Sequence, residues 1–399
     1  MQHFPILRSL VRVALANDTP PLRHQVERLV EAMSAAGEEE EAAALKKMLS
    51  SASRASELAP SRIAKSRTAF AVGERLTPTV PVPVDRESAA ELATVIMPDQ
   101  IHVRLPLFPA SVQENVEALL QEWESGEVLS QAGMHPTQSL LVYGAPGTGK
   151  TTLALWLAQR LGIPVVLARL DGLISSYLGA TARNVGTLFT FANRYECVLV
   201  LDEFDAIAKL RDDPNEVGEI KRVVNALLQN VDSRDGRGIT IGLTNHESLL
   251  DPAIWRRFEV QLAVPMPKFD QRVEIARRFL DKDDEAAVAE AKLLAWVCAG
   301  VSGAELQTMA TKYRKRRLLQ ADSGAAPIRT TVQLSRSTSV HISAERRRQI
   351  ERDDAALTRD LAAAERFSNV ELAALFDCST KTISRRLGGG GEEGDTDAE

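Results

Sequence analysis

The sharpest chemical signal in the sequence is a glycine-rich run that ends in a lysine and a threonine. It reads GAPGTGKT, fits the pattern GxxxxGK[ST], follows the apolar stretch LLVY and precedes the helical stretch TTLALWLAQRL. Glycines let successive backbone N–H groups point at phosphate oxygens. The ammonium group of Lys150 can reach the terminal phosphates, and the hydroxyl of Thr151 can bind Mg²⁺. The run therefore predicts a nucleotide and Mg²⁺ site made by Gly144, Ala145, Pro146, Gly147, Thr148, Gly149, Lys150, Thr151 and Thr152.

A pair of acids supplies the second signal. Asp202 and Glu203 follow the apolar run VLVL, and Asp202 lies 52 residues after Lys150. A carboxylate at the carboxyl end of a parallel strand faces the ligand crevice of an open sheet. We therefore expect Asp202 to hold Mg²⁺ and Glu203 to polarise an attacking water. A strand ending in two acids is a weak signal alone and a strong one at this distance from a phosphate-binding run.

Short apolar runs alternate with helical stretches in the middle of the chain. Near-continuous apolar strands separated by helices predict a parallel sheet covered on both faces, an α/β fold. Three helices without strands follow, at Asp270–Leu280, Ala286–Val297 and Ser302–Leu319. The expected strands are Leu140–Tyr143, Val165–Leu170, Cys197–Leu201, Ile239–Leu243 and Val260–Val264.

Shifts in composition divide the chain into segments. The stretch TPTVPVPVD suits an extended linker, a second stretch is rich in Ser, Thr and Ala, and the chain ends in glycines followed by EEGDTDAE. The predicted segments are a helical N-terminal domain at 1–76, a Pro-rich linker at 77–97, the α/β domain at 98–266, a helical domain at 267–320, a linker at 321–344, a helical C-terminal segment at 345–387 and a flexible acidic tail at 388–399.

Composition excludes several classes of protein. The 48 Lys and Arg against 54 Asp and Glu give a net charge of −6, so the whole chain is not a polycation that coats nucleic acid. Three widely separated cysteines exclude a disulfide scaffold and a cysteine zinc module. No apolar run approaches the roughly 18 residues needed to cross a bilayer, and the N-terminus carries no clear export signal. We therefore expect a cytoplasmic protein with no membrane partner.

From about Pro98 to Gln320 the chain resembles an AAA+ ATPase of the AAA clade, which includes katanin, spastin and the membrane-anchored protease ATPases. The matching segments are SSYLGATARNVGTLFTFANRYECVLVLDEFDAIAKLRDD, ITIGLTN, LDPAIWRRFE and VSGAEL, in the order of the clade. The resemblance implies a P-loop NTPase fold, a helical lid domain at 267–320 and hydrolysis of ATP with Mg²⁺. No HExxH motif is present, so the sequence lacks the protease half that some relatives carry.

The resemblance also implies roles for single residues. Asn245 would position the lytic water, and Gly303 would lie near the nucleotide base. Arg256 and Arg257 would be arginine fingers that act on a neighbouring subunit, which implies a ring, most often of six subunits. The pore loop of that ring would contain Tyr177, Leu178 and Gly179.

The segment VELAALFDCSTKTISRRL, Val370–Leu387, resembles a helix-turn-helix. Its second helix carries the possible DNA contacts Lys381, Arg385 and Arg386. The pattern favours the helix-turn-helix shape over a plain amphipathic pair of helices that packs on the lid or on a partner, but it leaves DNA contact open. The segment 345–387 has nine basic and eight acidic residues, so its net positive charge is small for a DNA-binding module.

These observations favour an oligomeric ATPase that remodels, unfolds or translocates a protein substrate through a central pore. The N-terminal helices would dock the substrate or an adaptor, and a separate protease is left open as a partner. The alternative is a DNA-associated ATPase of a mobile-element, defence or regulatory system, recruited through its C-terminal helices. A slow nucleotide-switched scaffold is disfavoured by the complete set of catalytic residue types.

Overall fold

The computed structural model describes most of the chain after residue 73. The chain divides into two compact units, residues 1–65 and 66–399. No helix among the described residues has the length and apolar character needed to cross a bilayer. The described residues are 74–174, 178–203, 205, 217–234, 238–250, 252–280, 284–320, 325–364 and 366–388, with Val30, Met33, Glu38, Ala42, Ala43, Leu45 and Lys46 of the first unit. The predicted N-terminal docking domain and acidic tail therefore lie almost wholly outside them.

A six-stranded sheet forms the centre of the α/β domain, with the order β1-β3-β4-β5-β2-β6. All neighbouring strands are parallel except β1, which pairs antiparallel with β3 at the edge. This confirms the predicted α/β fold and its five strands. The strands are β1 Ala93–Ile96, β2 Ser139–Tyr143, β3 Val165–Ala168, β4 Cys197–Leu201, β5 Gly238–Thr244 and β6 Val260–Ala263.

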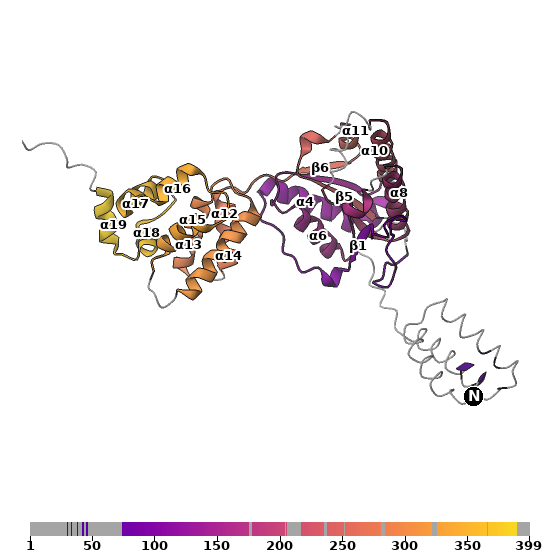
Figure 1. Ribbon diagram of the computed structural model, residues 1–399, viewed down its shortest axis with the longest axis horizontal. Coiled ribbons are helices and arrows are strands. Elements are labelled where there is room, and N and C mark those ends of the chain that lie inside the picture. Colours follow the sequence, from indigo (N-terminus) through magenta and orange to yellow (C-terminus); the bar gives the residue numbers. More distant parts are fainter. Residues whose placement is uncertain are drawn as a thin grey trace, which may run out of the picture. The chain divides into compact units, whose positions relative to one another are not determined.

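Both faces of the sheet are covered by helices because alternate strand residues point to opposite sides. In β4, Leu199 packs with α8 (Leu178–Arg194) and α10 (Val217–Asp232). Val200, one residue on, packs with α4 (Ala110–Glu124) and α6 (Lys150–Leu161). Figure 1 shows the two helix pairs on opposite sides of the sheet. The four inner strands β2, β3, β4 and β5 are thus buried on both faces, which explains their nearly continuous apolar sequences.

The prediction of a linker at 77–97 is wrong. The segment contains the edge strand β1, and Leu92 and Ala93 are fully buried in the core beside α8. The Asp85 carboxylate accepts hydrogen bonds from Ser88 and from Asn184 of α8. Prolines do not prevent this packing, because an edge strand or extended segment can leave N–H positions unused. The apolar residues between the prolines bury the segment against the domain.

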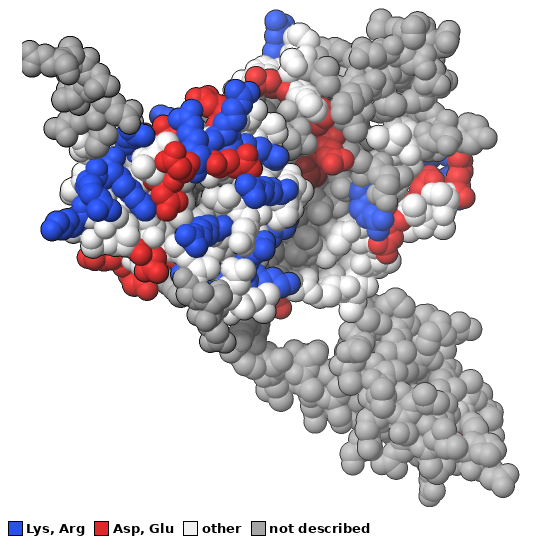
Figure 2. Space-filling model, turned by 60° about the vertical axis from the view of Figure 1, so that its left-hand side comes forward, with Lys and Arg blue, Asp and Glu red and all other residues white. Residues whose placement is uncertain are grey.

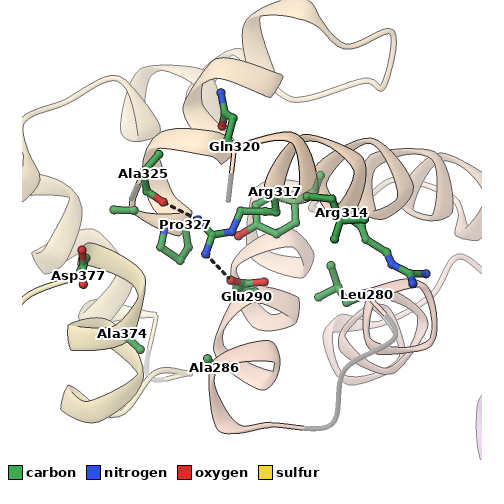
Figure 3. A pocket seen from close by; sticks show the side chains of 13 residues that line it. Leu280, Ala286, Glu290, Arg314, Arg317, Gln320, Ala325, Pro327, Ala374 and Asp377 are labelled. Atoms are coloured by element: carbon green, nitrogen blue, oxygen red, sulfur yellow. Dashed lines mark hydrogen bonds and ion pairs between the residues drawn. The ribbon is translucent and has the colours of Figure 1, made fainter. Parts of the chain in front are cut away.

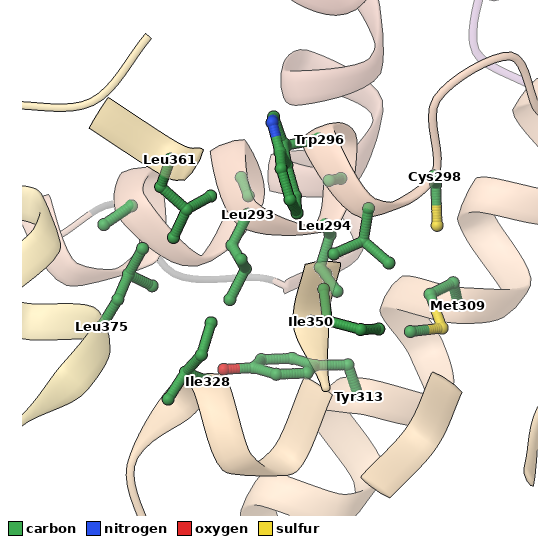
Figure 4. Close-up of a cluster of buried hydrophobic side chains, with 14 of the residues drawn as sticks. Leu293, Leu294, Trp296, Cys298, Met309, Tyr313, Ile328, Ile350, Leu361 and Leu375 are labelled. Carbon is green, nitrogen blue, oxygen red and sulfur yellow. The ribbon is translucent and has the colours of Figure 1, made fainter. Parts of the chain in front are cut away.

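The helices after the sheet form one body with one core rather than a lid and a separate C-terminal segment. Trp296, Tyr313, Ile328 and Leu375 come from four different helices of this body and meet in the core (Figure 4). The helices are α12 Phe269–Leu280, α13 Glu285–Val297, α14 Gly303–Leu319, α15 Pro327–Ser337, α16 Ala344–Ile350, α17 Asp354–Ala363, α18 Asn369–Phe376 and α19 Thr380–Gly388.

The prediction of a linker at 321–344 is also wrong in its described part. Helix α15 lies there, with Pro327 in its first turn and Ile328 and Leu334 buried in the shared core. Its buried Thr331 donates its hydroxyl to the Pro327 carbonyl, a bond within the helix. Short polar side chains that bond to the helix backbone can be buried at low cost, so the Ser- and Thr-rich composition did not mark an exposed segment.

Candidate functional site

Backbone shape builds the phosphate-binding loop, residues 144–151, between β2 and α6. Gly144, Gly147 and Gly149 all have positive φ, at 148°, 75° and 100°. A Cβ atom at Gly144 would lie 2.2 Å from the Val264 carbonyl oxygen, so no other residue fits there. Gly149 in the left-handed region also begins α6. The N-terminus of α6 and the loop N–H groups therefore present positive charge to the same space.

Lys150 is the buried cation of this loop. Its Nζ donates to the carbonyl oxygens of Gly144 and Ala145 at 2.8 and 2.9 Å and to Asn245 Oδ1 at 2.7 Å. Burial lowers the pKa of Lys150, and the carboxylates of Asp202 and Asp205 oppose that shift. The ammonium group has three donors and all three are directed, so a phosphate arriving in the loop meets a charge that is already positioned.

The two predicted acids lie at the end of β4, beside the loop. Asp202 Oδ2 accepts the hydroxyl of Thr151 at 2.8 Å, which brings the two predicted Mg²⁺ ligands together. Asp202 Oδ1 accepts the backbone N–H of Glu203 at 2.8 Å. Glu203 has φ 50°, a strained value for a residue with a side chain, and its side chain is exposed. Such strain is typical of residues held for function.

The residues fit the Mg²⁺ ion that such sites use. Mg²⁺ is usually bound by one or two carboxylates together with substrate phosphates, and it keeps several waters. One carboxylate and one hydroxyl side by side at the phosphate-binding loop match that demand. The described residues contain no cluster of three or more His, Cys, Asp or Glu that could hold a metal ion without such a substrate.

Asp205 is a positioning residue that sequence reasoning missed. It is almost fully buried, and its Oδ1 accepts the hydroxyl of Thr244 at 3.2 Å and the backbone N–H of Asn245 at 3.4 Å. The Thr244 hydroxyl accepts the backbone N–H of His246 in turn. These bonds fix the end of β5, where Asn245 projects to Lys150. An acid three residues after Asp202 was a visible signal, but its partners lie about 40 positions away in the sequence.

A cavity of about 850 Å³ opens over the phosphate-binding loop, and it is called the nucleotide cavity below. The segment 102–108, the α/β domain and the helices after the sheet form this cavity. Arg278 of α12 joins the helices to the first segment by donating to the Leu105 carbonyl at 3.0 Å. The Ala304 N–H donates to the Gly147 carbonyl at 3.0 Å, so α14 begins directly on the loop. Besides the loop, Thr152, Asp202, Glu203, Asn245 and Gly303, its lining includes His102, Val103, Arg104, Pro106, Leu107, Phe108, Pro265, Pro267, Ile275, Phe279, Ala304 and Gln307.

Sequence reasoning missed the segment 102–108 and the α12 side chains of this cavity. Phe108, Ile275 and Phe279 give it apolar walls that suit a flat base, whereas the loop end is polar. Gly303 also lines the cavity, where a Cβ atom on it would lie 3.4 Å from the Gly147 carbonyl oxygen, and its place near the nucleotide base stays a prediction.

The two predicted arginine fingers lie outside this cavity. Arg256 and Arg257 follow the short helix α11 (Pro252–Trp255), and both side chains are exposed. Arg257 forms an ion pair with Asp232 at the end of α10. Arg256 has no ion pair with any residue that the structure describes. Neither arginine lines the nucleotide cavity of its own chain.

None of the predicted pore and DNA-contact residues is among the described residues that line the nucleotide cavity. Tyr177 is outside the described residues, and the backbone of Leu178 and Gly179 begins α8. Lys381 and Arg385 are exposed on α19. Arg386 is not available as predicted. Its guanidinium binds Asp354 at 3.2 Å and lies 5.1 Å from the centre of the Phe376 ring, so it holds α19 against its neighbours.

A second cavity, of about 510 Å³, lies among the ends of α13, α14, α15 and α18, and no predicted site residue lines it. Arg317 spans it between the Glu290 carboxylate and the Ala325 carbonyl (Figure 3). Burial raises the pKa of Tyr313 beside Glu290. The charges of Arg317 and Glu290 are therefore matched to each other within this cavity.

Comparison of the sequence with known proteins agrees with a nucleotide-binding site at this position. Residues 140–266 match the family model described as ATPase family associated with various cellular activities (AAA). An uncharacterized AAA family ATPase of Sinorhizobium fredii is 37% identical over 248 residues, which cover 61% of this chain and 72% of that protein. The proteasome-activating nucleotidase of Archaeoglobus fulgidus is 33% identical over 208 residues, and the 26S proteasome subunit RPT4 of Saccharomyces cerevisiae is 30% identical over 208. Both matches cover 50% of this chain, which spans about half the length of each of these two relatives.

Proposed function

We propose that this chain, which belongs to the AAA family of ATPases and hydrolyses ATP, acts as a cytoplasmic ring of identical subunits that remodels protein substrates. The observation that carries the proposal is the place of Arg256 and Arg257. Every other predicted catalytic side chain lies at the nucleotide cavity, whereas these two lie exposed outside it. With these two arginines as fingers, the site of one chain would be incomplete, and a second copy would complete it.

The polar residues at and behind the phosphate-binding end of the cavity would each have a distinct task in hydrolysis. The loop N–H groups and Lys150 would bind the phosphates, and Thr151 and Asp202 would hold Mg²⁺, which would supply neutralisation of phosphate charge. Glu203 polarises the attacking water as a general base, and Asn245 orients that water. Asp205 keeps Asn245 in place.

An arginine from a neighbouring subunit would stabilise the charge that spreads over the transferring phosphoryl group. In phosphoryl transfer such a finger is worth roughly 10³ to 10⁵ in kcat. The subunits would number six if the ring follows the clade that the sequence resembles. Assembly would then control hydrolysis, because an isolated chain lacks this group.

A mixing experiment tests the ring. Glu203→Gln and Arg256→Ala should each be nearly inactive alone. In randomly mixed rings about a quarter of the interfaces pair an intact Glu203 with an intact Arg256, so mixing should restore up to roughly a quarter of wild-type turnover. Arg256→Lys mixed with Glu203→Gln is the matched control and keeps the charge without the planar group. If mixing restores no turnover and the protein remains monomeric in the presence of ATP, the ring is refuted.

The protein substrate is supported by the relatives that are named for proteasome activation and by the predicted pore residue Tyr177. Tyr177→Ala should keep ATP hydrolysis but lose its stimulation by an unfolded probe protein such as labelled casein, and Tyr177→Phe should keep both. N-terminal residues would dock the substrate, and a separate protease would receive it. Unchanged stimulation in Tyr177→Ala would favour the alternative, a ring recruited to DNA.

A further inference from the structure

The last two helices of the chain, α18 and α19, are joined by a turn of three residues. Asp377 takes φ 51°, and the N–H of Cys378 donates to the Ala373 carbonyl at 3.0 Å, which ends α18. The Ser379 hydroxyl accepts the Thr382 N–H at 3.2 Å and begins α19. Both helix ends are thus satisfied locally, so the angle between the helices is fixed by the turn and not by a flexible connection.

Helix α19 buries a single side chain completely and exposes the opposite face. Ile383 is fully buried in the core that contains Leu372 and Phe376 of α18. The exposed face carries Lys381 and Arg385, which lie one turn apart, flanked by Thr380 and Ser384. None of the nine residues of α19 is acidic. At 1.5 Å per residue the helix is about 13 Å long, and the major groove of DNA, about 12 Å wide, admits an α-helix.

The two exposed cations of α19 have no charged partner in the described part of the chain. Neither Lys381 nor Arg385 forms an ion pair with a residue that the structure describes. Arg386, by contrast, is engaged by Asp354 and Phe376. The same helix therefore divides its basic residues between a structural one, which faces the body, and two that face solvent.

The surrounding body is more basic than the rest of the chain. Residues 267–388 contain 22 Lys and Arg against 17 Asp and Glu, although acids exceed bases in the whole sequence. Arg347 and Arg348 of α16 and Arg359 of α17 are exposed as well. Figure 2 shows basic side chains spread over this side of the molecule with smaller acidic groups among them. A polyanion would meet exposed cations over an area wider than α19, although the five acids of the tail at 389–399 offset the charge excess of this body.

We propose that the exposed face of α19 binds double-stranded DNA in the major groove, with Lys381 and Arg385 on phosphates or base edges and α18 behind them as the supporting helix. Thr380 and Ser384 supply neutral hydrogen bonds on the same face. One copy holds few cations, so each module binds weakly by itself. Several copies in one assembly act on one duplex together, which multiplies their affinity.

The DNA site is fixed to the helical body that lines the nucleotide cavity. Lys292 of α13 pairs with Glu371 of α18 at 2.5 Å in a partly buried contact, and both helices share one core. Helix α14 of the same body begins on the phosphate-binding loop. DNA held by α19 would therefore be attached to the same helical body that lines the nucleotide cavity.

Binding of a labelled 30-base-pair duplex of mixed sequence by the full-length protein, with a slowly hydrolysed ATP analogue, tests the proposal. Fluorescence anisotropy is measured at several salt concentrations for wild type and for the double variant Lys381→Ala/Arg385→Ala. Each phosphate contact contributes about 0.9 to the slope of log affinity against log salt. The double variant should have a slope flatter by up to about two units and roughly tenfold weaker binding at low salt.

The double variant Lys315→Ala/Arg329→Ala is the matched control, because it removes one exposed Lys and one exposed Arg from α14 and α15 of the same body. It should bind almost like wild type, and both variants should keep wild-type ATP turnover and melting temperature. Equal losses in the two variants would assign binding to net charge and overturn the role of α19. Absence of duplex binding by wild type at low salt, or tighter binding of a single strand, would overturn the proposal outright.

Discussion

Replacing Asp205 by alanine should separate ATP binding from ATP turnover. Asp205 does not itself line the nucleotide cavity, but its carboxylate accepts hydrogen bonds from Thr244 and from the backbone of Asn245, which does line it. In Asp205→Ala the fully buried Thr244 hydroxyl and the Asn245 N–H lose their acceptor. The phosphate-binding loop and Asp202 remain in place, so the nucleotide still has its main ligands.

The size of the effect follows from these contacts. Each buried donor left without a partner costs about 1–3 kcal/mol, so the free energy of unfolding should fall by roughly 2–5 kcal/mol, less if the backbone relaxes. Asn245 would lose its fixed position beside Lys150, and a displacement of about 1 Å in a catalytic group costs on the order of 100-fold in rate. We therefore expect kcat to drop about 100-fold while the Kd for ATP changes little.

Steady-state hydrolysis gives kcat, calorimetric titration with ATP gives Kd, and thermal unfolding gives Tm. Asp205→Asn is the matched control, because it keeps an acceptor oxygen for Thr244 and Asn245 and loses only the charge. It should recover most of the Tm and a large part of kcat. An ATP affinity that falls as much as kcat, or an alanine variant with wild-type kcat, would refute the positioning role.

Three further predictions concern charge at defined residues. Lys150→Ala should abolish ATP binding, whereas Glu203→Gln should bind ATP and lose at least roughly 100-fold in hydrolysis; equal loss of affinity in both, measured by titration, would contradict the assignment. Because burial lowers the pKa of Lys150 and Asp205 opposes this, Asp205→Asn should lower that pKa further, so that ATP binding weakens at a lower alkaline pH than in wild type; an unmoved alkaline limb would argue against the coupling. Hydrogen bonds from Ser88 and Asn184 lower the pKa of Asp85 to about 2, so its charge stabilises the fold above the usual aspartate pKa and this stability is lost as pH falls towards 2. Asp85→Asn should therefore lower Tm at neutral pH, with the difference shrinking in acid, and a difference constant across pH would exclude this cause.

The sequence alone predicted the nucleotide site because the residues that form each part of it lie close together in the sequence. The turn of the phosphate-binding loop needs its glycines and its lysine within a few residues, and Asp202 needs only an apolar strand before it. The positions of Gly144, Lys150, Thr151 and Asp202 could therefore be predicted, as could the five strands β2 to β6. Burial on both faces leaves a continuous apolar run that any reading of the sequence can find.

The tertiary structure decided which partner each polar group takes. In the sequence Asp205 looks like any acid near a strand end, and only the fold shows that Thr244 of β5 donates to it. In the same way Arg386 looks like its neighbour Arg385 in the sequence, but in the structure it contacts Asp354 and Phe376 on the inner face of α19. The segments 77–97 and 321–344 were misread for the same reason. Composition reports how a segment behaves in water, whereas its burial depends on an apolar surface supplied by distant parts of the chain.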